Sequence, residues 1–279
     1  MENKNNKYLI SVDLDSTLLR DHIDVSENTL TYIHELIAKG HHFIINTGRP
    51  WQSACQFQQL LGIHEPIIST NGGLVCVVSD DYKKIISNIQ YNVDLEIVKK
   101  ILLATKSYTY GYALTTMLGF YSNDISMLPP WLVHDNERIT IYDKCLEVDE
   151  IKEKPIHLEL FCNNNDDAEM ILVVLEAYSS KIDYTHWAFE ENFHTFEVVA
   201  KGCSKGRAML DLADSYGISH DHILAFGDQL NDLSMLELAS PGVAMINSNP
   251  EVLSRIKETT ELDSEHDGVV EYLKKHIKL

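Results

Sequence analysis

The chain has 279 residues and a formal net charge of -19, from 23 basic and 42 acidic side chains. This acidity argues against nucleic acids and anionic membranes as partners, because both attract basic proteins. An anionic substrate would need a site where a metal ion, a lysine or a helix N-terminus reverses the local charge.

The composition, with 44% hydrophobic and 23% charged residues, is typical of a globular protein, and the length allows two domains. No apolar stretch approaches the roughly 18 residues of a membrane span, and the polar N-terminus lacks the apolar core of a signal segment. The cysteines are odd in number and form no CxxC pair, which predicts reduced thiols and a cytoplasmic protein. They are Cys55, Cys76, Cys145, Cys162 and Cys203. Nothing in the sequence indicates an oligomeric state.

The first predicted element is a buried strand over residues 8–12, which is followed at once by Asp13 and Asp15. Carboxylates two residues apart point the same way if the extended backbone continues. Like charges this close repel, so the pair requires a cation or a shared proton. Taken alone, the pair is equally compatible with a strand end that opens an Asx turn.

Two strand–helix units follow the first strand. Ser26 is a typical N-cap for a helix, and strands over residues 43–46 and 66–69 end in Thr47 and Asn71-Gly72. Strands and helices that alternate at this spacing predict right-handed βαβ units and a parallel sheet.

The pattern changes after residue 73 to a hairpin and then to an α+β module. Its predicted elements are a helix over 92–105, strands over 108–112, 118–121, 138–142 and 156–161, a helix over 166–178, and strand-like runs around Tyr184 and Phe196. We therefore expect residues 90–194 to form a domain inserted into a discontinuous one made of residues 1–89 and 195–279. His157 and Glu159 share a face of one inserted strand, where exposure to solvent is favoured over contact with substrate.

The alternation of strands and helices resumes near Val198. Its predicted elements are a helix from Ser204 to Gly217, a strand over 223–226, a helix over 233–238, a strand over 243–245 and a closing helix over 269–277. Lys205 lies in the first turn of a helix, where a positive charge opposes the helix dipole unless an anion or acidic groups compensate it. The alternative is an exposed lysine.

Polar residues follow four of the predicted strands, namely Asp13 and Asp15, Thr47, Asp228, and Asn247. Because the carboxyl ends of parallel strands share one edge of the sheet, these side chains should converge. A cluster of carboxylates with no His or Cys nearby suits Mg²⁺. The alternative is a solvated acidic helix start, in which Asp232 favours the dipole.

These residue types together predict phosphoryl transfer. Asp13 is a carboxylate at neutral pH and needs no base to act as a nucleophile. Mg²⁺ and Lys205 would offset its repulsion from a phosphate, and Thr47 and Gly48 would hold phosphate oxygens. Asp15 could protonate the leaving alcohol and then deprotonate water.

The order of motifs DxDx[ST]L, Thr-Gly-Arg, Lys and GDxxND resembles the haloacid dehalogenase (HAD) superfamily of phosphatases. The insertion between the Thr and Lys motifs is similar to the Cof-like subclass IIB, which carries a C2-type cap. The resemblance covers nearly the whole chain. It implies an α/β fold in which a doubly wound, Rossmann-like parallel-sheet core (1–89 and 195–279) carries an α+β cap (90–194) that sets substrate specificity.

The resemblance also implies a role for each motif residue. Asp13 would be the nucleophile and Asp15 the general acid and base. Mg²⁺ would be bound by Asp13, the backbone carbonyl of Asp15 and Asp228. Asp232 would support the metal site without binding the metal directly. The residues that bind or orient the phosphate would be Thr47, Gly48, Lys205, Asn231 and Asn247.

Two positions depart from the family pattern. Ser16 stands where the family usually has glycine, and Ile246 interrupts the usual Ala-Met-Gly-Asn run. The expected reaction is hydrolysis of a small phosphorylated metabolite such as a sugar phosphate. The alternatives are a phosphotransferase such as a phosphomutase and a non-catalytic protein that binds phosphorylated metabolites. No motif identifies the substrate.

Overall fold

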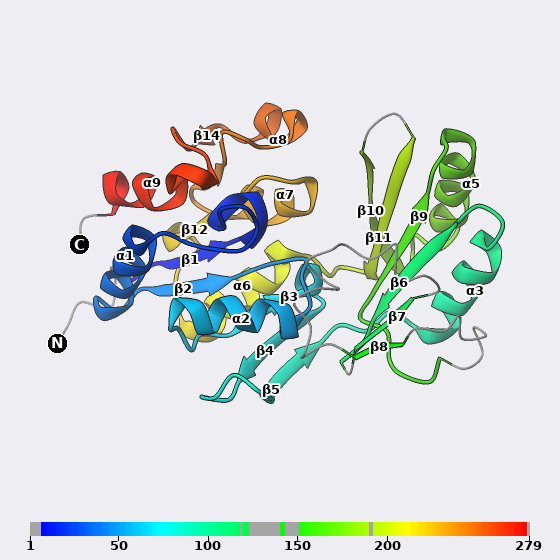
Figure 1. The fold of residues 1–279 in the computed structure, drawn as a ribbon, viewed down its shortest axis with the longest axis horizontal. Coiled ribbons are helices and arrows are strands. Elements are labelled where there is room, and N and C mark those ends of the chain that lie inside the picture. The colour runs from blue at the N-terminus through cyan, green and yellow to red at the C-terminus, as the bar shows by residue number, and fades with distance from the viewer. Residues whose placement is uncertain (1–6, 118, 123–139, 143–150, 190–191, 278–279) are drawn as a thin grey trace. The chain divides into compact units, whose positions relative to one another are not determined.

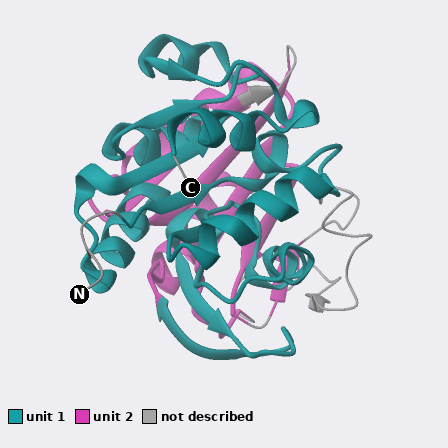
Figure 2. Ribbon diagram, turned by 90° about the vertical axis from the view of Figure 1, so that its left-hand side faces the viewer, with its two compact units in different colours: residues 1–89, 204–279 teal, residues 90–203 magenta. Residues whose placement is uncertain are grey.

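The structure is a computed structural model that describes residues 7–277 apart from 118, 123–139, 143–150 and 190–191. The chain divides into two compact units (Figure 2). Unit 1 is made of residues 1–89 and 204–279, and unit 2 of residues 90–203. No helix in the described part of the chain has the length and apolar character needed to cross a membrane.

Unit 1 is built on a parallel sheet of strand order β14-β13-β12-β1-β2 (Figure 1). The strands are β1 (Leu9–Val12), β2 (His42–Ile45), β12 (Ile223–Gly227), β13 (Gly242–Ala244) and β14 (Glu258–Thr259). The first four follow the predicted apolar runs. β14 was not predicted, because a strand of two polar residues carries no hydrophobic pattern.

Helices cover both faces of this sheet (Figure 1). They are α1 (Glu27–Ala38), α2 (Trp51–Leu61), α6 (Lys205–Tyr216), α7 (Leu233–Leu238), α8 (Pro250–Arg255) and α9 (Gly268–His276). On one face, Met209 of α6 packs in a cluster with Ala225 of β12. On the other face, the Phe226 ring meets Tyr272 of α9 edge-on at 5.5 Å. Since successive side chains of a strand alternate between faces, this arrangement buries both sides of β12.

A small sheet of β3 (Ile67–Ser69), β4 (Leu74–Val78) and β5 (Ile85–Gln90) extends unit 1. β3 lies beside β2, is joined to Asn46 just after β2 by a parallel bridge at Ile68, and pairs antiparallel with β4. The predicted third strand therefore adjoins the main parallel sheet but is not one of its five strands.

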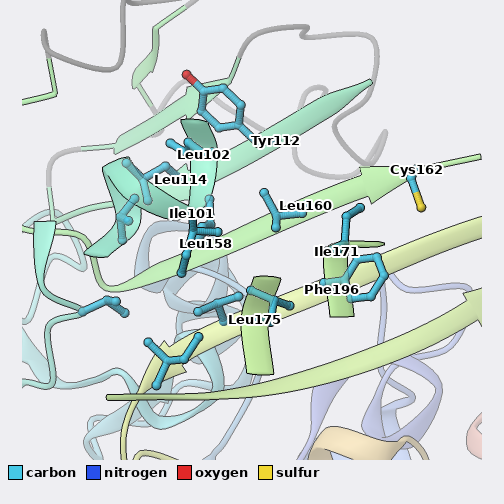
Figure 3. Packing of buried hydrophobic residues seen from close by; sticks show 14 of the residues in the cluster. Ile101, Leu102, Tyr112, Leu114, Leu158, Leu160, Cys162, Ile171, Leu175 and Phe196 are labelled. Atoms are coloured by element: carbon cyan, nitrogen blue, oxygen red, sulfur yellow. The ribbon is translucent and has the colours of Figure 1, made fainter. Parts of the chain in front are cut away.

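Unit 2 contains a sheet of order β10-β11-β9-β6-β7-β8, in which the pairings of the described residues are antiparallel except that of β7 with β8. The strands are β6 (Gly111–Thr115), β7 (Gly119–Ser122), β8 (Thr140–Tyr142), β9 (His157–Cys162), β10 (Ile182–Phe189) and β11 (Phe193–Ala200). Two helices, α3 (Leu95–Thr105) and α5 (Asn165–Glu176), pack on one face of it. Figure 3 shows Ile101 and Ile171 from these helices among Leu158, Leu160 and Phe196 from the sheet.

The boundary between the units differs from the predicted one. From the sequence, the boundary was predicted after residue 194, with the α/β pattern resuming near Val198. In the structure, unit 1 resumes at Ser204. β11 runs through the predicted boundary and pairs with both β10 and β9, which keeps it in unit 2. The part of the predicted 138–142 strand that precedes Thr140 lies outside the described residues.

Candidate active site

Asp13 and Asp228 follow neighbouring strands of the unit 1 sheet. β1 and β12 pair with Val12 opposite Phe226, and the backbone N–H of Asp13 donates to the Phe226 carbonyl over 3.0 Å. The two side chains therefore leave the same edge of the sheet. Carboxylate oxygens of Asp13, Asp228 and Asp232 lie within 4.8 Å of one another, and all three residues are buried.

Lys205 bridges two members of this acidic cluster. Its Nζ donates to Asp13 Oδ1 over 2.8 Å and to Asp232 Oδ1 over 2.6 Å, and 1% of the residue is exposed. The alternative of an exposed lysine is therefore wrong. The Ser204 side chain accepts a hydrogen bond from the backbone N–H of Arg207, so the cap fixes the start of α6 at the lysine.

Asp232 holds the loop that follows β12. Its Oδ2 accepts hydrogen bonds from the backbone N–H groups of Asp228 and Gln229, both over 2.9 Å. A Cβ at Gly227 would lie 2.5 Å from the Asp232 Cβ, so the close approach requires glycine. Asp232 is fully buried, which contradicts the alternative of a solvated acidic helix start at this residue.

Thr17 belongs to the cluster, although its role was not predicted from the sequence. Its Oγ1 donates to Asp228 Oδ1 over 2.9 Å. A signal for this contact was available, because Thr17 is the hydroxyl position of the first motif. Its partner depends on the turn at Leu14–Leu18, which folds back beside the end of β12.

Electrostatics in the cluster favour an additional cation. Burial raises the pKa of Asp13 above its ordinary value although Lys205 opposes the shift. Burial and the neighbouring carboxylates raise the pKa of Asp228, against a hydrogen bond from Thr17. Three buried carboxylates share one ammonium group, so a further positive charge would be needed to keep all of them ionised. The oxygen-only donor set fits Mg²⁺.

Asp15 points to different partners from those of Asp13. Its Oδ2 accepts from Arg49 Nε over 2.7 Å, and its Oδ1 accepts from Arg49 Nη2 over 2.5 Å and lies 2.9 Å from His22 Nδ1. Burial alone would raise the pKa of Asp15, but the hydrogen bonds from Arg49 and His22 lower it to about 2. The Thr-Gly-Arg motif was the signal for Arg49, whereas His22 belongs to no motif.

A second group of polar residues lies beside the strand ends that carry the acidic cluster. Its members are Thr47, Gly48, Asn71 and Asn231. Thr47 is buried, and its Oγ1 accepts from the backbone N–H of Arg49 over 3.1 Å. Asn231 Nδ2 donates to Asn71 Oδ1 over 2.9 Å, and a Cβ at Gly48 would lie 3.2 Å from that same oxygen. The structure thus gathers three of the residues expected to bind phosphate, namely Thr47, Gly48 and Asn231, and Asn71 joins them from the turn after β3.

The two departures from the family pattern lie close to Asn247. Ser16 has a φ of 56°, a left-handed backbone that glycine adopts without strain. Asn247 is exposed, and its Nδ2 donates to the Ser16 carbonyl over 2.8 Å, so it supports this turn. Ile246 is exposed, and its backbone N–H donates to Thr260 Oγ1 over 3.0 Å.

One residue in unit 2 contradicts its expected exposure. His157 is 3% exposed, and its buried Nε2 has no hydrogen-bond partner among the described residues, so the expectation that it faces solvent is wrong. Glu159, on the same strand face, lies opposite Glu197 of β11.

The chain is similar to known proteins along nearly its whole length. A family model described as haloacid dehalogenase-like hydrolase matches residues 10–273. A 5-amino-6-(5-phospho-D-ribitylamino)uracil phosphatase of Bacillus subtilis (strain 168) is 30% identical over 275 residues, which are 98% of each chain.

Solved structures share the fold. A haloacid dehalogenase-like hydrolase of B. subtilis matches with a TM-score of 0.77 and 24% identity over 97% of this chain and 100% of that one. A sugar phosphatase of HAD subclass IIB matches with a TM-score of 0.76 and 21% identity over 96% of this chain and 98% of the other. The predicted fold class, a doubly wound α/β core with an inserted α+β module, is confirmed.

Proposed function

Since the chain belongs to the haloacid dehalogenase-like hydrolase family and is a phosphatase, we propose that it hydrolyses small phosphate monoesters with Mg²⁺ through an aspartyl-phosphate. One observation carries the proposal. The buried cluster of Asp13, Asp228 and Asp232 holds the Lys205 ammonium group, and Asp15 lies two residues from Asp13.

The proposed reaction has two steps. In the first, the Asp13 carboxylate attacks phosphorus and the bond from phosphorus to the ester oxygen breaks. Asp15, which Arg49 and His22 hold ionised and which must therefore take up a proton before this step, gives that proton to the leaving alcohol. In the second, water attacks the aspartyl-phosphate and gives its proton to Asp15, so the phosphorus–Asp13 bond breaks and inorganic phosphate leaves. Both side chains return to their starting protonation states.

The residues around Asp13 prepare it for this attack. Lys205 binds Asp13 Oδ1 at 2.8 Å, which fixes the carboxylate and favours its ionised form. Asp13, Asp228 and the Asp15 backbone carbonyl would hold Mg²⁺, and Asp232 would support the site through Lys205 and the loop backbone. The metal would supply positive charge that offsets repulsion between the carboxylate and phosphate oxygens.

Phosphate binding is assigned in the same proposal to five residues, namely Thr47, Gly48, Lys205, Asn231 and Asn247. A hydroxyl, a backbone N–H, an ammonium group and two amides offer the donors that phosphate oxygens accept. The assignment of Asn231 has the strongest support, because its amide donates to Asn71 Oδ1 and lies beside Gly48.

We assign unit 1 as the catalytic core and unit 2 as the cap that selects the substrate. The first ester to test is 5-amino-6-(5-phospho-D-ribitylamino)uracil, which the B. subtilis relative is named for, followed by sugar phosphates. We also propose a cytoplasmic location, because the number of cysteines is odd and the sequence has no CxxC pair.

The test is phosphate release from a panel of esters with Mg²⁺ and with excess chelator. Activity should need Mg²⁺, and Asp13→Asn should abolish turnover because an amide is no nucleophile, whereas the exposed Asp214→Asn should leave it unchanged. A borohydride-trapped aspartyl-phosphate at Asp13 would identify the intermediate. Activity in chelator, turnover by Asp13→Asn, or transfer of phosphate to a second sugar would each contradict the proposal.

A further inference from the structure

A tight turn after the first motif brings His22 to the Asp15 carboxylate. Asp21 and His22 have φ values of 46° and 61°, and the backbone N–H of Ile23 donates to the Arg20 carbonyl over 3.0 Å. Two left-handed residues closed in this way form a type I′ turn. A bridge between Arg20 and Asp24 closes the base of the turn.

Arg49 is the fixed partner of the same carboxylate. It is 2% exposed, its Nη1 donates to Ser53 Oγ over 3.3 Å, and its guanidinium lies 4.7 Å over the Phe57 ring. Its Nη2 also donates to the backbone carbonyl of His22 over 3.1 Å. The arginine therefore binds both the carboxylate and the turn that presents His22.

Among the described residues, the contacts to Asp15 fill all but one of its acceptor positions. An ionised carboxylate only accepts hydrogen bonds, so His22 must donate through Nδ1–H. Arg49 Nη2 and His22 use both positions of Oδ1, and Arg49 Nε uses one position of Oδ2. Of the roughly four acceptor positions of a carboxylate, the remaining one lies on Oδ2.

We propose that His22 is a positioning residue that, with Arg49, fixes the plane of the Asp15 carboxyl group so that Oδ2 exchanges the proton in both chemical steps. The inference rests on the proposed function, which gives Asp15 the acid and base roles. Without the His22 contact, Arg49 still binds the carboxylate, but Oδ1 regains a vacant acceptor position and can compete for the proton. Small misplacements of a reacting group cost large factors in rate.

His22→Ala tests the inference, and His22→Asn is the matched rescue. The Asn amide nitrogen can occupy the place of Nδ1, and Asn tolerates a left-handed backbone. Ile23→Ala is the control, because Ile23 lies in the same turn and is 70% exposed. Each variant is assayed as the full chain with Mg²⁺, on an alkyl phosphate that the wild type hydrolyses and on 4-nitrophenyl phosphate.

His22→Ala should lower kcat on the alkyl phosphate about tenfold with KM unchanged, a fraction of the roughly 10² to 10⁴ that an acid–base residue supplies. On 4-nitrophenyl phosphate, whose leaving group needs no proton, rapid mixing should show a larger burst of nitrophenolate, because only hydrolysis of the aspartyl-phosphate is slowed. His22→Asn should restore both readouts, and Ile23→Ala should match the wild type.

Three results would overturn the positioning role. They are His22→Ala behaving as Ile23→Ala does, a faster turnover, or a loss that is equal on both esters with raised KM and no burst. The variant Asp15→Asn separates this failure from failure of the proposed function. If Asp15→Asn keeps full activity, the acid–base assignment itself is wrong. If Asp15→Asn is slow and His22→Ala adds nothing to it, the two residues act in one step.

Discussion

Among the described residues, Lys205 supplies the ammonium group that the buried carboxylates share. Its ammonium group lies 2.8 Å from Asp13 Oδ1 and 2.6 Å from Asp232 Oδ1, and the residue is almost fully buried. Removing one partner of a buried ion pair leaves the other charge without compensation. The lysine therefore has a structural role in addition to its proposed role in binding phosphate.

We expect Lys205→Met to lower the free energy of unfolding in chelator by about 3 kcal/mol, the scale for breaking a buried ion pair. The matched control is Lys201→Met, because Lys201 also binds an aspartate, at 2.6 Å from Asp183, but its side chain is 53% exposed. That change should stay within about 1 kcal/mol. Urea denaturation measures both. Equal small losses would mean that Lys205 contributes no net stability.

The position of a residue in this site could be predicted from the sequence only where a regular element brings it to its partner. Asp13 and Asp228 follow apolar runs, and the rule for parallel strands brings their ends to one edge, as the structure shows. His22 reaches Asp15 through a turn whose two left-handed residues are Asp21 and His22, and no local sequence pattern predicts that conformation. The pKa of Asp13 was also beyond the sequence, because its ordinary value takes no account of burial.

The start of α6 depends on the close packing of two glycines. Gly72 has a φ of 89°, and a Cβ there would lie 2.3 Å from the Ser204 carbonyl oxygen. A Cβ at Gly206 would lie 2.1 Å from the Ser234 carbonyl oxygen. Since Lys205 lies between the residues in these contacts, any shift of the helix start moves its ammonium group away from Asp13.

Gly72→Ala should therefore destabilise the protein by more than about 2 kcal/mol, the left-handed backbone and the clash adding together, and should lower kcat. Gly202→Ala is the control for the backbone cost alone, because Gly202 has a φ of 77° and nothing within 4 Å of its Cβ position. It should cost about 1 kcal/mol and leave kcat unchanged. Urea denaturation and steady-state rates test the pair. Equal effects would show that the contact with Ser204 does not matter.

β9 carries a half-buried acid, Glu159, whose titration should affect stability. Burial raises the pKa of Glu159 from 4.5 to about 7. The folded state then holds this proton more tightly than the unfolded chain, so the stabilising contribution is complete below pH 4.5 and is lost as pH rises through 7. The free energy of unfolding of the wild type should fall over this window relative to that of Glu159→Gln.

The comparison is made by urea denaturation at several pH values between 4.5 and 8. Glu169→Gln is the control, because Glu169 lies on the exposed side of α5, and its profile should follow the wild type. A constant difference between the wild type and Glu159→Gln across the range would contradict the raised pKa of Glu159.

The elements were predictable where a hydrophobic period and an end signal agreed. The helix after Ser26 begins at its expected cap, since the Ser26 side chain accepts a hydrogen bond from the Thr29 backbone N–H, and the helix before Gly217 ends at its expected cap, since Gly217 is left-handed. β6 was expected at residues 108–112 and lies at Gly111–Thr115, because its neighbour β9 sets the register. Pairing partners distant in the chain decide such boundaries, and a single sequence does not show them.

The two units of the molecule each have a hydrophobic core of their own. In unit 1, Met209, Ala225 and Ala244 belong to one cluster, and in unit 2, Leu158, Ile171 and Phe196 belong to another. A domain with its own core can in principle fold alone. The predicted boundary after residue 194 would have divided β11, whose residues pair on both sides within unit 2.

This division determines how the proposed roles of the units can be tested. We expect a chain in which a short linker replaces residues 90–203 to fold and bind Mg²⁺, because it retains the unit 1 sheet and the Ser204 cap. It should keep slow activity on 4-nitrophenyl phosphate and lose its preference among natural esters.

A matched deletion of 90–194 should fold less well, since it leaves most of β11 without partners. Circular dichroism establishes folding before the rates are compared. If the folded unit 1 kept the full chain's order of preference, specificity would reside in unit 1, and Ser16 and Ile246 would be the first residues to exchange.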